Sequence, residues 1–292
     1  MPVQKIACLL MLLGIGSVCT AQPQRQQRLP DGVVAHRNLS YITENADRKH
    51  QLDLYLPAKV TDQMPLFIWI HGGGWRNGSK NNINRSVSAL LSDGYAIASL
   101  DYRLDGLDKH PNHIHDCHAA IRWLVANSKK YGYNTDKMAV GGSSAGGHLA
   151  LLVGMTTDVP AMQGKLGDHL DATYKFKAIV DFYGPFDLYA LGQAKSHGQE
   201  TKVTQAFSQD ASPASYLDAS DPPVLIFHGM QDRVVVPEQS ITLDKMCKAL
   251  GIESELHLFE DAKHGGPAFS NQDITSQIKT FLNKHLDGKH AK

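Results

Sequence analysis

The chain has 292 residues, in which 29 lysine and arginine residues balance 29 aspartate and glutamate residues. This length is enough for one large domain with a substantial apolar core. Because the sequence has no basic stretch interleaved with aromatic residues, its composition excludes the usual nucleic-acid-binding classes, and we expect no nucleic-acid partner.

The first residues have the pattern of a secretory signal peptide. A positive charge and a mostly apolar run at 6–18 precede small residues and an expected cleavage site after Ala21. The apolar run is too short, and the residues after it too polar, for a stable membrane span. A lipid anchor on Cys19 is the alternative, although the valine before it suits lipidation poorly. We therefore expect a signal peptide at 1–21, a flexible leader at 22–32, and a secreted or periplasmic protein.

The remaining chain alternates short apolar runs with segments of helical periodicity. In chain order, we expect strands at 33–42, 50–56 and 65–71, a helix at 82–93, a strand at 95–101, a helix at 113–130, a strand at 138–142, a helix from 145, a strand at 177–182, an irregular polar stretch at 184–221, a strand at 223–228, a helix at 237–250, a strand at 254–260 and a helix at 271–286. This alternation predicts a single α/β domain over 33–292, with a mostly parallel, doubly wound sheet of about eight strands and helices on both faces. The first two strands, which no helix separates, should begin the sheet as an antiparallel pair.

Residues 141–148 contain the pattern G-x-S-x-G in one frame only, with Ser144 at its centre. The pattern lies between an expected strand and an expected helix, which is the setting of a nucleophilic serine on a sharp turn. Glycines let such a turn close, and the start of a helix aims free backbone N–H groups, that of Ala145 among them, at nearby negative charge. A plain glycine-rich turn is the alternative.

A serine hydroxyl needs a base that takes its proton and a third group that orients the base. In a fold of this kind the chain order is serine, acid, histidine, and the last two lie in loops after late strands. Asp232 follows the expected strand 223–228, and His264 follows the strand 254–260. We therefore predict Ser144 as the nucleophile, Asp232 as the acid and His264 as the base.

Other side chains compete for these roles. Asp261 shares a loop with His264 and is the competing acid, whereas Glu238 falls inside the next helix. His228 and His257 lie within expected strands, where core or sheet-face histidines are the usual interpretation.

The expected strand 65–71 runs into the sequence His-Gly-Gly-Gly-Trp at 71–75. Glycines in such a loop let backbone N–H groups approach a substrate without a side chain in the way. The predicted oxyanion donors are the amides of Gly73, Gly74 and Ala145. Aromatic side chains are candidates to line the site, with ordinary core positions as the alternative. These candidates are Trp75, Tyr183 and Phe186.

A dense run of metal-ligating side chains lies between residues 110 and 118. On a helix that begins near residue 113, His115 and His118 share a face, but the other side chains spread around the helix. We therefore expect no metal here, and Ser-His-Asp chemistry needs no cofactor. Cys117 and Cys247, the two cysteines after the signal peptide, fall on expected helices, where buried free thiols fit better than a disulfide.

Together these motifs resemble the α/β-hydrolase esterases, in the branch of hormone-sensitive-lipase-like and BD-FAE-like carbohydrate esterases. The resemblance covers residues 33–286 and rests on several motifs: His71-Gly-Gly-Gly-Trp75, Asp101-Tyr-Arg-Leu104, Ile114-His-Asp-Cys117 with Arg122-Trp-Leu124, Gly142-Ser-Ser-Ala-Gly-Gly-His-Leu149, His228-Gly-x-x-Asp232-x-x-x-Val-Pro237, and the glycine-flanked His264. It implies an α/β-hydrolase fold and the same catalytic and oxyanion residues as above. It also implies structural roles for Asp101, Arg103 and Asp116. In His264-Gly-Gly-Pro the chain departs from relatives that often have an aromatic residue after His-Gly.

The resemblance implies a serine esterase, Ser-His-Asp chemistry implies an acyl-enzyme, and the signal peptide implies that the enzyme is exported. Few residues precede His71, so we expect no helical N-terminal cap, and 184–221 remains as a lid-like insertion. An open, polar-rimmed site suits a hydrophilic substrate with a small acyl group. Together with the resemblance, this favours acetyl or feruloyl esters of plant polysaccharides such as xylan as substrates, with a general short-chain carboxylesterase as the alternative. A prolyl-peptidase-like enzyme or an inactive binding protein fits less well, and the oligomeric state is left open.

Overall fold

The computed structural model describes residues 29–44, 46–61, 63–196 and 209–286. The predicted signal peptide and most of the predicted leader lie outside the described residues, so both stay predictions. Among the described helices, none is long and apolar enough to cross a membrane.

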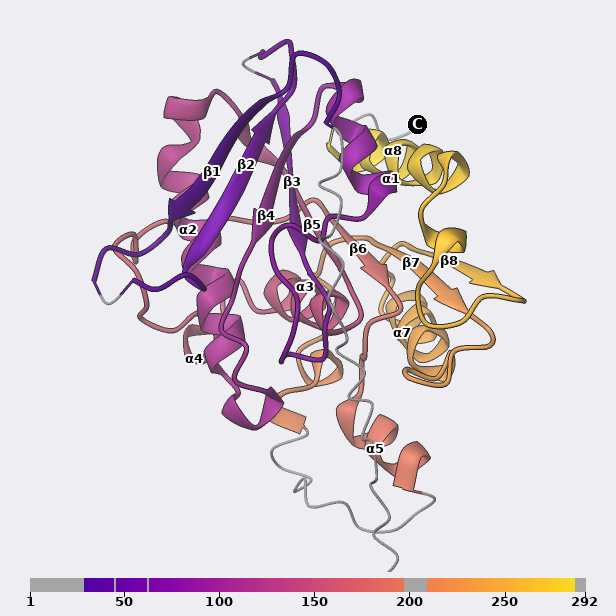
Figure 1. Ribbon diagram of the computed structural model, residues 1–292. Coiled ribbons are helices and arrows are strands. Elements are labelled where there is room, and N and C mark those ends of the chain that lie inside the picture. Colours follow the sequence, from indigo (N-terminus) through magenta and orange to yellow (C-terminus); the bar gives the residue numbers. More distant parts are fainter. Residues whose placement is uncertain (1–28, 45, 62, 197–208, 287–292) are drawn as a thin grey trace, which may run out of the picture.

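A sheet of eight strands runs through the centre of the domain in the order β1-β2-β4-β3-β5-β6-β7-β8 (Figure 1). The strands are β1 (Val34–Ser40), β2 (Gln51–Leu56), β3 (Pro65–Ile70), β4 (Ala96–Leu100), β5 (Asn134–Ser143), β6 (Ala178–Phe182), β7 (Val224–Gly229) and β8 (Ser254–Phe259). β2 pairs antiparallel with both β1 and β4, and every later pairing in the sheet is parallel. Strands β4, β6 and β7 are buried along their whole length, which explains why they are mostly apolar, although each contains one polar side chain: Ser99, Asp181 and His228. The predicted mostly parallel α/β sheet is confirmed.

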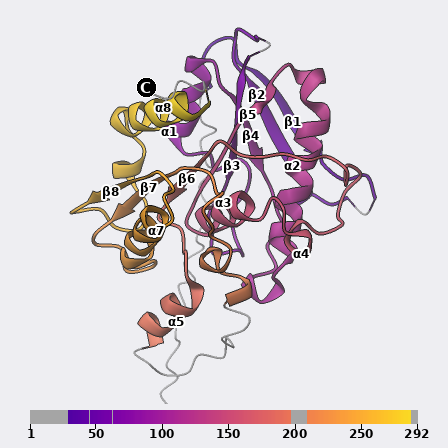
Figure 2. The ribbon, with the colours of Figure 1, turned by 180° about the vertical axis from the view of Figure 1, so that it is seen from behind.

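Helices cover both faces of this sheet, as Figure 2 shows from behind. They are α1 (Arg85–Ser88), α2 (Asn112–Tyr131), α3 (Ala145–Met155), α4 (Pro160–Gln163), α5 (Leu188–Ser196), α7 (Glu238–Ala249) and α8 (Gln272–Leu286). Ile121 of α2, Leu149 of α3 and Leu243 of α7 belong to the larger core. Val87 of α1 and Ile278 of α8 belong to a second core on the other face. These helices thus bury apolar side chains against the two faces of the sheet.

Some elements differ from their expected form. The helix expected at 82–93 is one α-turn, α1, continued by a 3-10 turn at Ala89–Asp93 and ended by Gly94 at φ 89°. Helix α4 was not expected, because a single turn bounded by Pro160 and Gly164 is too short to show helical periodicity. The insertion at 184–221 contains α5, and its middle lies outside the described residues. Both Cys117 and Cys247 are buried free thiols, as predicted.

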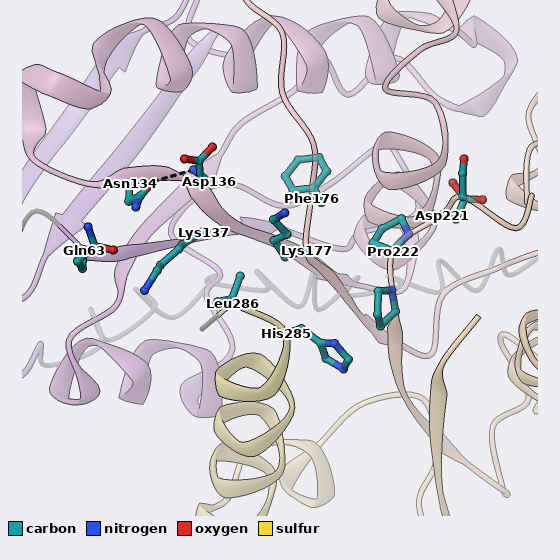
Figure 3. A pocket seen from close by; sticks show the side chains of 12 residues that line it. Gln63, Asn134, Asp136, Lys137, Phe176, Lys177, Asp221, Pro222, His285 and Leu286 are labelled. Atoms are coloured by element: carbon teal, nitrogen blue, oxygen red, sulfur yellow. Dashed lines mark hydrogen bonds between the residues drawn. The ribbon is translucent and has the colours of Figure 1, made fainter. Parts of the chain in front are cut away.

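The carboxyl ends and the amino ends of the parallel strands lie at opposite edges of the sheet, and the two edges differ in their loops and pockets. The loops after β3, β5, β7 and β8 gather at the carboxyl edge, where parallel strands place the ends of their connections. At the opposite edge lies a pocket of about 600 Å³ beside the starts of β5, β6 and β7. Figure 3 shows Lys137, Lys177 and His285 around it. This pocket contains none of the predicted site residues, and a strand's length separates it from the carboxyl edge.

Candidate active site

Ser144 occupies the sharp turn between β5 and α3. Its backbone has φ 54° and ψ −121°, a conformation that residues other than glycine rarely adopt. Its amide donates to the Phe182 carbonyl oxygen at 2.8 Å. A Cβ on Gly142 would lie 2.2 Å from the carbonyl oxygen of Gly146. A Cβ on Gly146 would lie 2.1 Å from the carbonyl oxygen of Ile70. Only glycine therefore fits at both positions, which is the physical reason for the G-x-S-x-G pattern.

His264 joins the other two predicted residues of the triad. Its Nε2 lies 2.8 Å from Ser144 Oγ, and its Nδ1 lies 2.6 Å from Asp232 Oδ2. Because a carboxylate only accepts, Nδ1 carries the hydrogen and Nε2 is left to accept from the serine hydroxyl. The competing acid, Asp261, has an exposed side chain, and the Nδ1 that it would have to bind is already bonded to Asp232.

The environment of Asp232 keeps its carboxyl group ionised. Its Oδ1 accepts the amides of Val234 and Val235 at 2.7 and 3.0 Å. Burial alone would raise the pKa of Asp232, but the nearby His228 ring and the hydrogen bonds from His264 and the Val235 amide outweigh it and hold that pKa well below its usual range. A charge that persists at all moderate pH values can orient His264 and stabilise its protonated form.

A pH dependence follows from this arrangement. We expect kcat/KM for a simple ester to fall on acidification through roughly pH 5–8, because a protonated His264 cannot take the Ser144 proton. Asp232, with its lowered pKa, stays ionised over this range and adds no second acidic step. Steady-state rates on p-nitrophenyl acetate across the range would measure it. A flat profile would contradict the role of His264 as base.

The loop after β3 packs against the nucleophile turn. A Cβ on Gly72 would lie 2.5 Å from the Ser143 carbonyl oxygen and 3.3 Å from Ser144 Cβ. Gly73 and Gly74 have φ 126° and φ 62°, and a Cβ on Gly74 would meet no atom within 4 Å. The loop is therefore close to Ser144 on one side and open on the other.

The start of α3 supplies a further donor beside this loop. Ala145 is the first helical residue after Ser144, so its amide has no acceptor within the helix. This amide and the glycine loop leave backbone N–H groups next to the serine, where an oxyanion would form. That Gly73, Gly74 and Ala145 are the donors remains a prediction.

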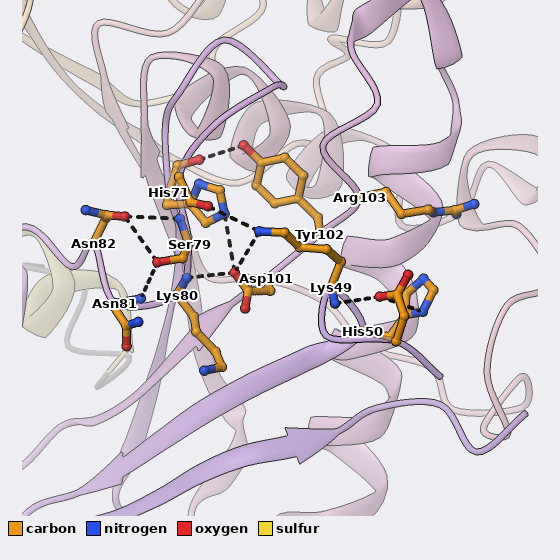
Figure 4. A network of polar contacts seen from close by, with 12 residues as sticks. Lys49, His50, His71, Ser79, Lys80, Asn81, Asn82, Asp101, Tyr102 and Arg103 are labelled. Atoms are coloured by element: carbon orange, nitrogen blue, oxygen red, sulfur yellow. Dashed lines mark hydrogen bonds and ion pairs between the residues drawn. The ribbon is translucent and has the colours of Figure 1, made fainter. Parts of the chain in front are cut away.

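A polar network behind the glycine loop fixes its position (Figure 4). Tyr102 donates its hydroxyl hydrogen to the His71 carbonyl oxygen at 2.9 Å, and its ring stacks on the imidazole with the centroids 4.4 Å apart. His71 Nδ1 lies 2.7 Å from the Gly72 carbonyl oxygen, so this nitrogen is the donor. Burial lowers the pKa of His71 to about 4, which keeps the ring neutral.

Asp101 closes the same network from the end of β4. It accepts the Lys80 amide at 2.9 Å and lies 3.8 Å from Lys49 Nζ. Lys49 also donates to the Gly78 carbonyl oxygen at 3.2 Å. The sequence predicts a structural role for Asp101, but it does not indicate the roles of Tyr102 and Lys80. Asp101 and Tyr102 directly follow a strand that pairs in parallel, and this position could have placed these two residues at the carboxyl edge of the sheet.

A second ion pair anchors helix α2. Arg103 Nη2 lies 2.6 Å from Asp116 Oδ1, and the Arg103 amide donates to Asp116 Oδ2 at 2.8 Å. Asp116 is fully buried, and although burial raises its pKa, the His50 ring 3.6 Å away and the hydrogen bonds from Arg103 lower that pKa overall. The pair ties the chain after β4 to the first turns of α2.

The three aromatic candidates lie in different environments. Tyr183, at φ 45°, packs its ring edge-on against His264 with the centroids 4.8 Å apart. Trp75 packs edge-on against His148 at 5.2 Å. Phe186 has 0% of its surface exposed and belongs to the larger core. The structure therefore places Phe186 in the larger core and Tyr183 in the second core, whereas Trp75 is only partly buried.

The histidine-rich stretch sends its side chains to separate partners. His115 Nε2 lies 2.8 Å from the Ala161 carbonyl oxygen. The two ring nitrogens of His118 are bonded to Tyr174 and to Thr156. Within the ranges that the structure describes, no three His, Cys, Asp or Glu side chains are grouped so that they could hold a metal ion.

Comparison with known proteins shows that the chain is similar to esterases. The model of the BD-FAE family matches residues 52–247. Esterase LipC of Mycobacterium tuberculosis is 31% identical over 239 residues, which are 75% of this chain and 58% of LipC. The chain spans about half the length of the curated relatives that it matches.

Two solved structures share the fold over most of this chain. A truncated carbohydrate esterase from gut microbiota has a TM-score of 0.77 at 25% identity, covering 87% of this chain and 96% of its own. A bifunctional GH43-CE protein of Bacteroides eggerthii has a TM-score of 0.75 at 26% identity, covering 89% of this chain and 36% of its own.

Proposed function

The chain belongs to the BD-FAE family of the α/β-hydrolase fold, and from this premise we propose that it hydrolyses carboxylic esters through an acyl-enzyme on Ser144. The observation that carries the proposal is the hydrogen-bonded line from Asp232 through His264 to Ser144 Oγ. A weak nucleophile, a base and a group that orients the base are the parts that acyl transfer requires.

Each step follows from the positions of these groups. Ser144 Oγ adds to the ester carbonyl carbon while His264 Nε2 takes its proton. The negative charge on the former carbonyl oxygen is met by the amides of Gly73, Gly74 and Ala145. The bond to the alcohol oxygen then breaks as His264 returns the proton to it. A water molecule, deprotonated by His264, releases the acid from Ser144 in the same way.

For the substrate we propose short acyl esters of carbohydrates, acetyl or feruloyl, on plant polysaccharides such as xylan. Support comes from the family and from a structural neighbour that is named a carbohydrate esterase. A general short-chain carboxylesterase is the second candidate, favoured by the similarity to Esterase LipC.

One comparison of specificity constants separates these two candidates. The kcat/KM values for acetylated xylan and feruloylated arabinoxylan are measured beside those for p-nitrophenyl acetate and butyrate. A carbohydrate esterase should favour at least one polysaccharide ester over the simple esters, because its alcohol side is bound as well as its acyl side. Turnover of simple esters with no release of acid from either polysaccharide would favour the carboxylesterase.

We also propose that residues 1–21 direct export and that 33–292 form one catalytic domain with a lid-like insertion at 184–221. The first part is supported by the charged start, the apolar run, and the change from small to polar residues at the Ala21–Gln22 bond. N-terminal sequencing of the exported protein should begin at Gln22, and an intact N-terminus would contradict cleavage.

A further inference from the structure

His228 is a buried histidine that the steps above do not use. It lies near the end of β7 and has 0% of its surface exposed, which agrees with the core position expected from the sequence. However, its Nε2 lies 3.4 Å from Asp232 Oδ2, the same oxygen that His264 Nδ1 contacts at 2.6 Å. A second imidazole therefore faces the acid of the candidate triad.

The hydrogen-bond partners of His228 define which nitrogen carries the hydrogen. Its Nε2 lies 2.9 Å from the Val235 carbonyl oxygen, and a carbonyl only accepts. Nε2 is therefore the donor, and its hydrogen bond goes to the Val235 carbonyl, while Asp232 Oδ2 lies 3.4 Å from the same nitrogen. The other nitrogen, Nδ1, lies 2.6 Å from Ser240 Oγ on α7, whose hydroxyl can donate to it.

Asp232 is thereby surrounded by N–H groups on both of its oxygens. Oδ1 accepts two backbone amides, those of Val234 and Val235. Oδ2 faces the side chains of His264 and His228. A carboxylate held in this way cannot rotate without losing donors, and each donor reduces the negative charge that acts on His264.

Other groups from neighbouring strands also face His228. Asp181 on β6 is fully buried, accepts the Gly184 amide at 3.1 Å, and interacts electrostatically with His228; burial raises the pKa of Asp181 to about 7. The Tyr183 ring lies edge-on to the His228 ring at 6.5 Å. With Asp232 and Ser240, these groups form the surroundings of the imidazole.

We propose that His228 is a positioning residue that acts on His264 through Asp232, by donating its Nε2–H toward the carboxylate oxygen that orients the base. This proposal rests on the proposed esterase function. A purely structural role, in which His228 only closes the loop 229–235 through the Val235 carbonyl, is the competing explanation. The two differ in whether the charge on Asp232, and so the protonation of His264, depends on His228.

Two substitutions at His228 distinguish these roles. His228→Leu removes the donor, whereas His228→Gln places a side-chain N–H where Nε2 now lies. We expect His228→Leu to lower kcat by roughly tenfold with little change in KM, the lower end of what a hydrogen bond to a charged group contributes. The acidic limb of its pH profile for kcat/KM should move to higher pH, because a less compensated Asp232 favours protonated His264. His228→Gln should restore both values toward those of the wild type.

Matched measurements make each outcome decisive. His257→Leu makes the same change on the adjacent strand, away from Asp232, and should leave the acidic limb in place. If the acidic limb of the kcat/KM profile does not move in His228→Leu, the proposal is overturned, whether or not the rate falls.

If His228→Leu does not fold, His228→Asn replaces it. This shorter amide cannot reach Asp232, so acidic limbs at the same pH in the Asn and Gln variants would overturn the proposal. A wild-type protein with no ester hydrolysis would overturn the proposed function as well, whereas failure confined to the His228 variants leaves that function intact.

Discussion

Ser144→Ala should lower kcat for ester hydrolysis by about 10⁴-fold or more while the protein remains folded. The expected loss is large because the variant has no oxygen at the position 2.8 Å from His264 Nε2, so no acyl-enzyme can form. The backbone oxyanion donors would remain and account for any residual rate. Steady-state hydrolysis of p-nitrophenyl acetate measures the effect, and circular dichroism checks the fold.

The neighbouring serine provides the matched control. Ser143 ends β5 and interacts with Tyr183, and the G-x-S-x-G frame does not centre on it. We expect Ser143→Ala to keep most of the activity. A nearly inactive Ser143→Ala together with an active Ser144→Ala would move the nucleophile by one residue and refute the frame.

Asp232→Asn should lower kcat by about 10⁴-fold, the second large effect. An asparagine amide can turn its NH₂ group toward His264 Nδ1, which forces the hydrogen to Nε2 and leaves no acceptor for the serine proton. The substitution also removes the charge that stabilises protonated His264. The kinetics of the purified variant on a simple ester would measure the loss.

Asp261→Asn is the control for this second prediction. Asp261 is exposed, in the same loop as the base. Its variant should hydrolyse esters at nearly the wild-type rate. A near-wild-type rate for Asp232→Asn combined with a large loss for Asp261→Asn would transfer the role of acid to Asp261.

The fold was predictable wherever local pattern and burial coincide. The strands β4, β6 and β7 are buried along their whole length, and their mostly apolar composition indicates this directly in the sequence. The order of the strands was not predictable, because the pairing of β2 with β4 joins segments separated by β3. Such long-range pairing leaves no local signature in the composition of either strand.

In the candidate site, too, some residues could be predicted from the sequence and others could not. Ser144, Asp232 and His264 follow strands in the order that the chemistry requires, and the structure brings them within hydrogen-bonding distance. The supporting residues could not be placed in this way. His228 looks like any buried strand residue until the loop after β7 folds Asp232 back onto it. Tyr102 likewise acquires its role only by stacking on His71 from the loop that follows the neighbouring strand β4.

The claim that Ser144 is the nucleophile is tested most directly by the site of covalent modification. The protein is treated with a fluorophosphonate, which reacts with activated serines, and its peptides are mapped by mass spectrometry. We predict one adduct on the peptide that contains residues 138–149, fragmenting to Ser144, and no adduct in Ser144→Ala. An adduct on another residue, or an undiminished adduct in Ser144→Ala, would contradict the account.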